Sequence, residues 1–216
     1  MSIWTKMKNT GLKTKIHGEI ALLEREATSR KKKFGVDLFD VLTQDKQKLL
    51  GVAAGTLFQG KQVDLKEPFD QARDDIAGIQ AKKDIKQKDL DVLEVKGSHT
   101  LPDSTMNDKV KKAGKAVADA GTSAKLKTEM ALLDRDMKIR KEQFGLEVFE
   151  LVKASDSKEK QGISGAVQNA LSNMSQQEKD IQACIDEAKA DIALIEGKIE
   201  SKRREIKMLD DEMNAA

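Results

Sequence analysis

Apolar residues recur every three to four positions along four stretches of the chain, and charged residues fill the positions between them. The clearest stretch contains Ile181, Ile185, Ala188, Ile192, Ile195 and Ile199, followed by Lys202, Ile206, Leu209 and Met213. This spacing places the apolar side chains along one face of an α-helix. Sustained over several heptads, it is typical of helices that pair side by side. The pattern therefore predicts an all-α fold with long, paired helices.

The other three stretches have the same period. The first contains Ile16, Ile20, Leu23, Ala27, Arg30 and Phe34, and the third contains Leu126, Met130, Leu133, Met137, Arg140 and Phe144. The second contains Phe69, Ala72, Ile76 and Ile79, and is then interrupted by Lys83 and Lys86 before Leu90 and Leu93. Leu22, Phe39 and Leu42 widen the stripe of the first helix, which suits a helix that touches more than one neighbour.

The four stretches form two copies of one unit. Residues 15–42 align without gaps with residues 125–152, and 11 of the 28 positions are identical. Residues 69–93 align with residues 185–209, with nine identities in 25 positions. The identities of the first block include Glu19, Leu22, Leu23, Arg25, Arg30, Lys31, Phe34, Gly35 and Phe39. Two matching blocks in the same order indicate a duplicated helical hairpin.

Clusters of Gly, Ser and Pro mark the predicted boundaries. We expect a basic amphipathic N-terminal segment at 1–14, a first hairpin at 15–96, a linker with a short helix at 97–122, and a second hairpin at 123–216. The first helix is expected to begin after Gly11 and to end near Leu50, with turns at 51–67 and 155–175. Pro68 suits the opening turn of the second helix, and Thr122 or Ser123 is a candidate cap for the third.

Composition narrows the architecture. Charged residues make up 35% of the chain and aromatic residues only 3%, so the apolar side chains can fill a narrow seam but not a wide interior. We predict four long helices, either as a four-helix bundle or as an elongated antiparallel coiled coil. The single cysteine, Cys184, and the lack of a long apolar run favour a cytoplasmic protein.

The pairs Phe34-Gly35 and Phe144-Gly145 occupy equivalent positions inside the two amphipathic blocks. Glycine within a helix costs about 1 kcal/mol relative to alanine, so its presence in both copies needs a reason. One interpretation is a close helix approach or a bend, and the other is a docking notch for a partner.

Basic runs make a second group of candidates, namely Arg30, Lys31, Lys32, Lys33, Arg140, Lys141, Lys202, Arg203 and Arg204. If each hairpin folds on itself, Arg30 to Lys33 lie near Lys82, Lys83 and Lys86, and Asp37 and Asp40 lie near Asp70, Asp74 and Asp75. Each hairpin would then have a basic zone and an acidic zone. Three interpretations stay open: ordinary solvated surface, electrostatic self-assembly, and contact with an anionic membrane.

The N-terminal segment places Trp4 beside Lys6 and Lys8, with no acidic residue before Glu19. This pattern fits a short helix that lies at a membrane interface, and it also fits the simpler interpretation of a frayed or docked terminus. Catalytic, cofactor and metal sites are not expected, because the two histidines and one cysteine form no ligand pattern and no phosphate-binding loop is present. Basic residues are not interleaved with aromatic ones, so nucleic-acid binding is not expected either.

The blocks ALLERE/ALLDRD and KKFGVDLFDVL/EQFGLEVFELV resemble those of uncharacterised tandem helical-repeat proteins from unicellular algae and related eukaryotes. That resemblance covers most of the chain and implies no function. In shape alone, long charged helices with a basic zone are similar to BAR-type membrane-binding modules. The sequence thus predicts a non-enzymatic scaffold that acts through partner helices or self-association, and the alternative is a peripheral membrane-binding module that contacts anionic lipid.

Overall fold

The computed structural model describes residues 3–43, 56–58, 61–63, 65–98, 106–157 and 176–214. These residues form the helices α1 (Ile3–Thr43), α3 (Lys66–Ser98), α4 (Met106–Ser157) and α6 (Gln176–Asn214). Two short antiparallel strands, β1 (Thr56–Phe58) and β2 (Lys61–Val63), pair with Thr56 opposite Val63. The predicted all-α class with four long, packed helices is confirmed, and the small hairpin lies within the segment expected to be a turn.

Two helix starts differ from the prediction. Helix α1 begins at Ile3, so most of the expected N-terminal segment is its first part. Helix α4 begins at Met106, and the expected short helix in the linker is continuous with the third helix. The Thr122 hydroxyl donates to the Ala118 carbonyl at 3.0 Å, as threonine does inside a helix, and caps nothing. The helix continues because glycine only weakens a helix and no proline lies between 106 and 157.

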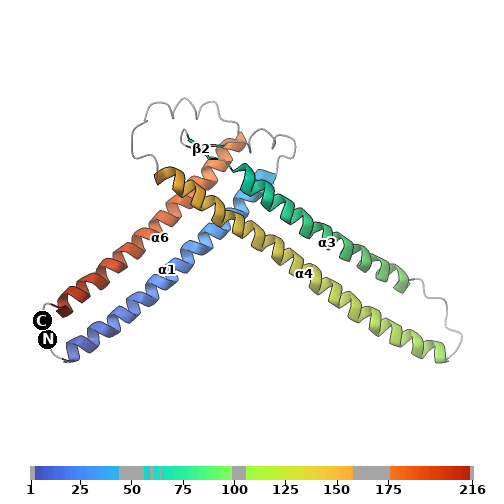
Figure 1. Cartoon of the computed structure of the whole chain (residues 1–216). Helices are drawn as coiled ribbons and strands as arrows, with labels where there is room; N and C mark the ends of the chain where they lie inside the picture. Colours follow the sequence, from blue (N-terminus) through green and yellow to red (C-terminus); the bar gives the residue numbers. More distant parts are fainter. Residues whose placement is uncertain are drawn as a thin grey trace. The chain divides into compact units, whose positions relative to one another are not determined.

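The chain divides into two compact units. Unit 1 comprises Met1–Phe69 and Lys141–Ala216, and unit 2 comprises Asp70–Arg140. Neither unit coincides with a predicted hairpin, because each helix pairs with a helix of the other copy. In unit 1, α1 packs against α6, and in unit 2, α3 lies beside α4 (Figure 1). The first helix was expected to end near Leu50, which lies outside the described residues. Most of the expected turns at 51–67 and 155–175 lie outside them as well.

In unit 1, α1 and α6 run antiparallel. Lys13 pairs with Asp210 at one end, and Arg30 pairs with Asp191 farther along, at 2.6 Å. Between them, Ile16 and Ile20 pack with Ile195 and Ile199 in one buried cluster. The apolar seam predicted for the last helix is buried from Ile181 to Ile199, while its continuation to Met213 is half-buried. The sequence period therefore identified the contact face of α6 correctly.

In unit 2, the seam between α3 and α4 is less buried. Ile76 and Ile79 are only half-buried, although their counterparts Ile192 and Ile195 are buried. Lys83 takes the position equivalent to Ile199 and pairs with Asp134 at 2.5 Å. Lys83 thus places an ion pair where the other helix pair has packing, whereas Lys86 corresponds to Lys202, which also forms an ion pair, with Glu19.

Replacing Lys83 with isoleucine is expected to stabilise unit 2 by about 1 kcal/mol. The half-exposed ion pair with Asp134 contributes little, whereas an isoleucine extends the apolar seam. Urea unfolding followed by circular dichroism measures the change. The reverse substitution in unit 1, Ile199→Lys, serves as the matched control. It places an unpaired ammonium in a buried cluster and is expected to destabilise the protein by about 2 kcal/mol or more. Destabilisation by Lys83→Ile would contradict this interpretation.

Candidate interaction surfaces

Helix α1 crosses the last part of α4 at two glycines. Gly35 and Gly145 are both buried, and each backbone lies directly against the other. A methyl group built on Gly145 would lie 2.6 Å from the Lys31 carbonyl oxygen, which is far inside van der Waals contact. The crossing therefore accepts no side chain at either position. Of the two interpretations of the Phe-Gly pairs, the geometry is that of close helix approach, and it leaves the glycines no open notch.

Phenylalanine rings surround this crossing. Phe34 stacks edge-on against Phe149 at 6.2 Å between centroids, and Phe144 meets Phe39 in the same way at 5.9 Å. Phe69, from the first turn of α3, contacts both Phe39 and Phe144. Five of the six phenylalanines of the chain meet here, all of them buried. Most of the few aromatic side chains of the chain are therefore buried together at this one crossing.

Reciprocal lysines fasten the same crossing. Lys31 of α1 pairs with Glu150 of α4 at 2.7 Å, and Lys141 of α4 pairs with Asp40 of α1 at 2.6 Å. Each ammonium also lies over a ring, Lys31 over Phe149 and Lys141 over Phe39. The hydrogen bond from Lys31 lowers the pKa of the Glu150 carboxyl, against the opposing effect of burial. Both lysine ammonium groups therefore have an acidic partner and a ring contact within the same chain.

The predicted zoning of charge is wrong. Arg30 donates to both Asp191 and Glu187 of α6, and the equivalent Arg140 donates to Asp75 of α3 at 2.7 Å. Burial lowers the pKa of Arg30, but hydrogen bonds and attraction from the two carboxylates outweigh it, so the guanidinium stays charged. The zones were derived from helices that pair within one copy. Because the helices pair between copies, basic positions face acidic ones.

The remaining basic candidates also have acidic partners. Lys32 pairs with Glu142 and Lys33 with Asp37, while Lys202 pairs with Glu19 and Glu205, Arg203 with Glu24, and Arg204 with Glu200. Of the N-terminal candidates, Lys8 is exposed on α1, and the side chains of Trp4 and Lys6 lie outside the described part of the structure. The structure thus brings the Phe-Gly pairs and Lys31 and Lys141 together, and distributes the other basic residues over separate ion pairs.

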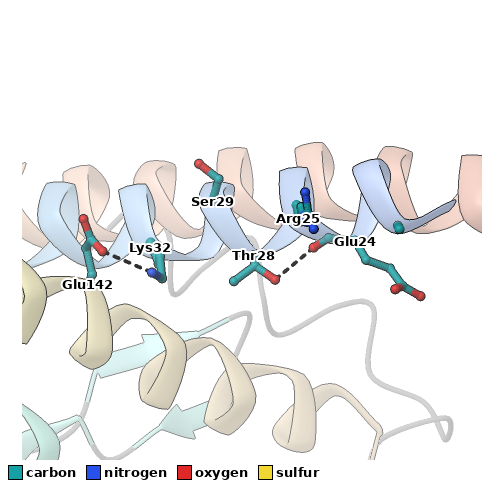
Figure 2. Close-up of a pocket in the computed structure, with 7 residues that line it drawn as sticks. Glu24, Arg25, Thr28, Ser29, Lys32 and Glu142 are labelled. Atoms are coloured by element: carbon teal, nitrogen blue, oxygen red, sulfur yellow. Dashed lines mark hydrogen bonds and ion pairs between the residues drawn. The ribbon is translucent and has the colours of Figure 1, made fainter. Parts of the chain in front are cut away.

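An open groove of about 570 Å³ runs along α1 beside the crossing (Figure 2). Its lining consists of Ala21, Glu24, Arg25, Thr28, Ser29, Lys32 and Glu142. Glu142 and Lys32 form an ion pair across it, and the Thr28 hydroxyl donates to the Glu24 carbonyl at 2.9 Å. Arg25 has no such partner in the figure. The groove lacks a buried polar group or an enclosed apolar floor of the kind that holds a small molecule.

Groups suited to metal or acid–base chemistry are sparse in the residues that the structure describes. No three His, Cys, Asp or Glu side chains among them are placed to hold a metal ion. Burial raises the pKa of the Cys184 thiol to about 11, so the reactive thiolate is scarce at neutral pH. His17 is exposed, and His99 lies outside the described ranges. None of the described helices has the length and apolar content needed to cross a bilayer.

One set of exposed residues was not among the sequence candidates. Leu22 is 63% exposed and the equivalent Leu132 is 53% exposed, although their neighbours Leu23 and Leu133 face the seams. The signal was present in the repeat, since ALLERE and ALLDRD differ only by two conservative acidic exchanges. The wider helix stripe predicted from Leu22 is wrong at this position, because both leucines lie at the surface.

Comparisons with known proteins add no relative to this geometry. No family model matches the chain, and neither a curated protein nor a solved structure matches it.

Proposed function

We propose that the protein is a non-enzymatic helical scaffold of the cytoplasm, which acts through contacts between its helix faces and other helices. The observation that carries this proposal is the pairing of the basic runs. All nine basic side chains of the runs lie within 4 Å of a carboxylate of the same chain. A membrane-binding surface needs cations that are free to meet lipid phosphates, and here that charge is already neutralised by neighbours.

The described helices fit such a role in a second way. Their outer faces combine charges of both signs with well-exposed aliphatic side chains, including Ile85, Val92, Leu194 and Met208. Aliphatic residues on an otherwise charged helix are the usual contact points for another helix. The same faces have little uniform charge to attract nucleic acid or lipid from a distance.

Vesicle co-sedimentation of the full chain tests this proposal. With vesicles of equal parts phosphatidylserine and phosphatidylcholine, we expect the protein to remain in the supernatant at low and at high salt. A matched variant, Glu24→Gln with Glu142→Gln, frees two cations at the surface. Arg203, which is exposed, loses its partner Glu24, and Lys32, which is half-exposed, loses its partner Glu142. We expect weak binding of this variant at low salt that high salt abolishes, because screening removes surface attraction.

Salt-sensitive sedimentation of the unaltered chain would favour the membrane-binding alternative and overturn the scaffold. In that case, removal of residues 2–15 locates the contact, since only a lipid-binding N-terminus would make the deletion reduce sedimentation.

A further inference from the structure

The sequence block retained in both copies contains a patch whose charged side chains form no ion pair with the part of the chain that the structure describes. On α1 the patch consists of Ala21, Leu22, Arg25 and Glu26, and on α4 of Ala131, Leu132, Arg135 and Asp136. We refer to these eight residues as the retained patches. All eight are exposed, and three of the four positions are identical between the copies, while the fourth is acidic in both.

Most other identities of this block have contacts within the molecule. Glu19 and Glu129 accept from Lys202 and Lys86, the retained arginines at 30 and 140 form ion pairs with α6 and α3, and the Phe-Gly pairs form the crossing. By contrast, within the described ranges no carboxylate lies within 4.0 Å of the Arg25 or Arg135 guanidinium. Likewise no described cation pairs with Glu26 or Asp136. Exposed leucines beside unpaired charges, kept in two copies, indicate a contact outside the chain.

The arrangement of each patch is self-complementary. Residues four apart lie one above the other on a helix, so Ala21 and Arg25 form one column and Leu22 and Glu26 form the adjacent column. Two such patches placed side by side and parallel about a two-fold axis bring the first column of one against the second column of the other. Arg25 then faces the partner's Glu26, and Leu22 faces the partner's Ala21, whose small side chain admits it.

We propose that the retained patches bind a second copy of this chain. An isologous contact uses the same surface on both subunits, so each charge in the patch must meet its opposite in the same patch of the partner. Both retained patches meet this condition, because each carries one arginine and one acidic residue. The patch on α4 has the same four chemical features, so it offers a second contact of the same kind. This inference rests on the proposed scaffold function and specifies its partner.

Sedimentation velocity of the full chain over a range of concentrations tests the contact. The unaltered protein is expected to self-associate reversibly. Arg25→Glu with Arg135→Glu leaves the patches wholly acidic, and Glu26→Arg with Asp136→Arg leaves them wholly basic. We expect each variant alone to associate on the order of 100-fold more weakly, because like charges then face each other. An equal mixture of the two variants is expected to regain association, since acidic patches meet basic ones.

Leucine variants separate this surface from general stickiness. Leu22→Ser with Leu132→Ser is expected to weaken association about tenfold, whereas Leu194→Ser, at a residue 60% exposed but outside the patches, is expected to leave it unchanged. Circular dichroism confirms that each variant keeps its helix content. A monomeric unaltered chain, insensitivity to both charge reversals, or a mixture that stays dissociated would each overturn the proposal. A monomer that also ignores vesicles removes only this contact, whereas vesicle binding removes the scaffold itself.

Discussion

Gly35→Leu is expected to be the most damaging single substitution in the chain, lowering the free energy of unfolding by at least about 3 kcal/mol. The new side chain would occupy the space of the Gly145 backbone, which belongs to a helix and cannot give way as a flexible side chain does. The two helices must separate, and the buried Phe34 and Phe144 then lose contacts. For a chain of this size, the loss corresponds to a fall in Tm of about 10 °C. Thermal and urea unfolding followed by circular dichroism measure both quantities.

Other glycines provide the control. A side chain at Gly18 or Gly197 meets nothing within 4 Å, although both glycines lie inside helices. Alanine at either position is expected to stabilise the protein by about 1 kcal/mol, because it removes the conformational cost of glycine. If Gly35→Leu and Gly18→Ala changed stability in the same direction, the lack of room for a side chain at the crossing would not be the reason that Gly35 is needed.

Phe144→Ala is expected to have an effect of similar size, a loss of about 3–5 kcal/mol. The Phe144 ring is fully buried and contacts both Phe39 and Phe69, so its removal leaves a cavity between three elements of unit 1. Helix propensity does not offset this loss, since alanine gains well under about 1 kcal/mol over phenylalanine. Urea unfolding gives the free energy, and near-ultraviolet circular dichroism reports the loss of fixed ring packing.

Leu151→Ala on the same helix is the matched control for this substitution. Leu151 is 42% exposed, so its truncation is expected to cost less than about 1 kcal/mol. Equal losses for Phe144 and Leu151 would mean that the ring cluster contributes no more than ordinary helix surface, contrary to the packing described above.

The sequence period predicted which face of each helix is buried, but it could not predict which helix lies against it. A stripe at heptad spacing specifies a contact face, and two copies of a unit offer each stripe two equivalent partners. Arg30 illustrates the ambiguity. An aspartate occurs at the same aligned position in both copies, as Asp75 and as Asp191, and either satisfies a guanidinium equally well. The structure selects Asp191 for Arg30 and Asp75 for Arg140.

Long-range packing decides this choice. The glycine crossing and the phenylalanine cluster lie between α1 and the end of α4. The Phe-Gly pairs indicated a close approach, but the period of a single helix does not specify which helix makes it. The start of α4 at Met106 was not predicted, and the reason is local. A polar segment that contains glycine is typical of a linker, but a helix that has already formed can extend through it. The retained patches could have been found from the repeat alone, by asking which identical positions face away from the seam.

Pairing between α1 and α6 also has a consequence for biosynthesis. Arg30 and its partner Asp191 are 161 residues apart, so α1 leaves the ribosome long before the last helix exists. The α3–α4 pair, whose Lys86 and Glu129 are only 43 residues apart, can form while translation continues. Until α6 has been synthesised, the isoleucine stripe of α1 stays uncovered. Late pairing of such distant segments slows folding and exposes the nascent chain to aggregation.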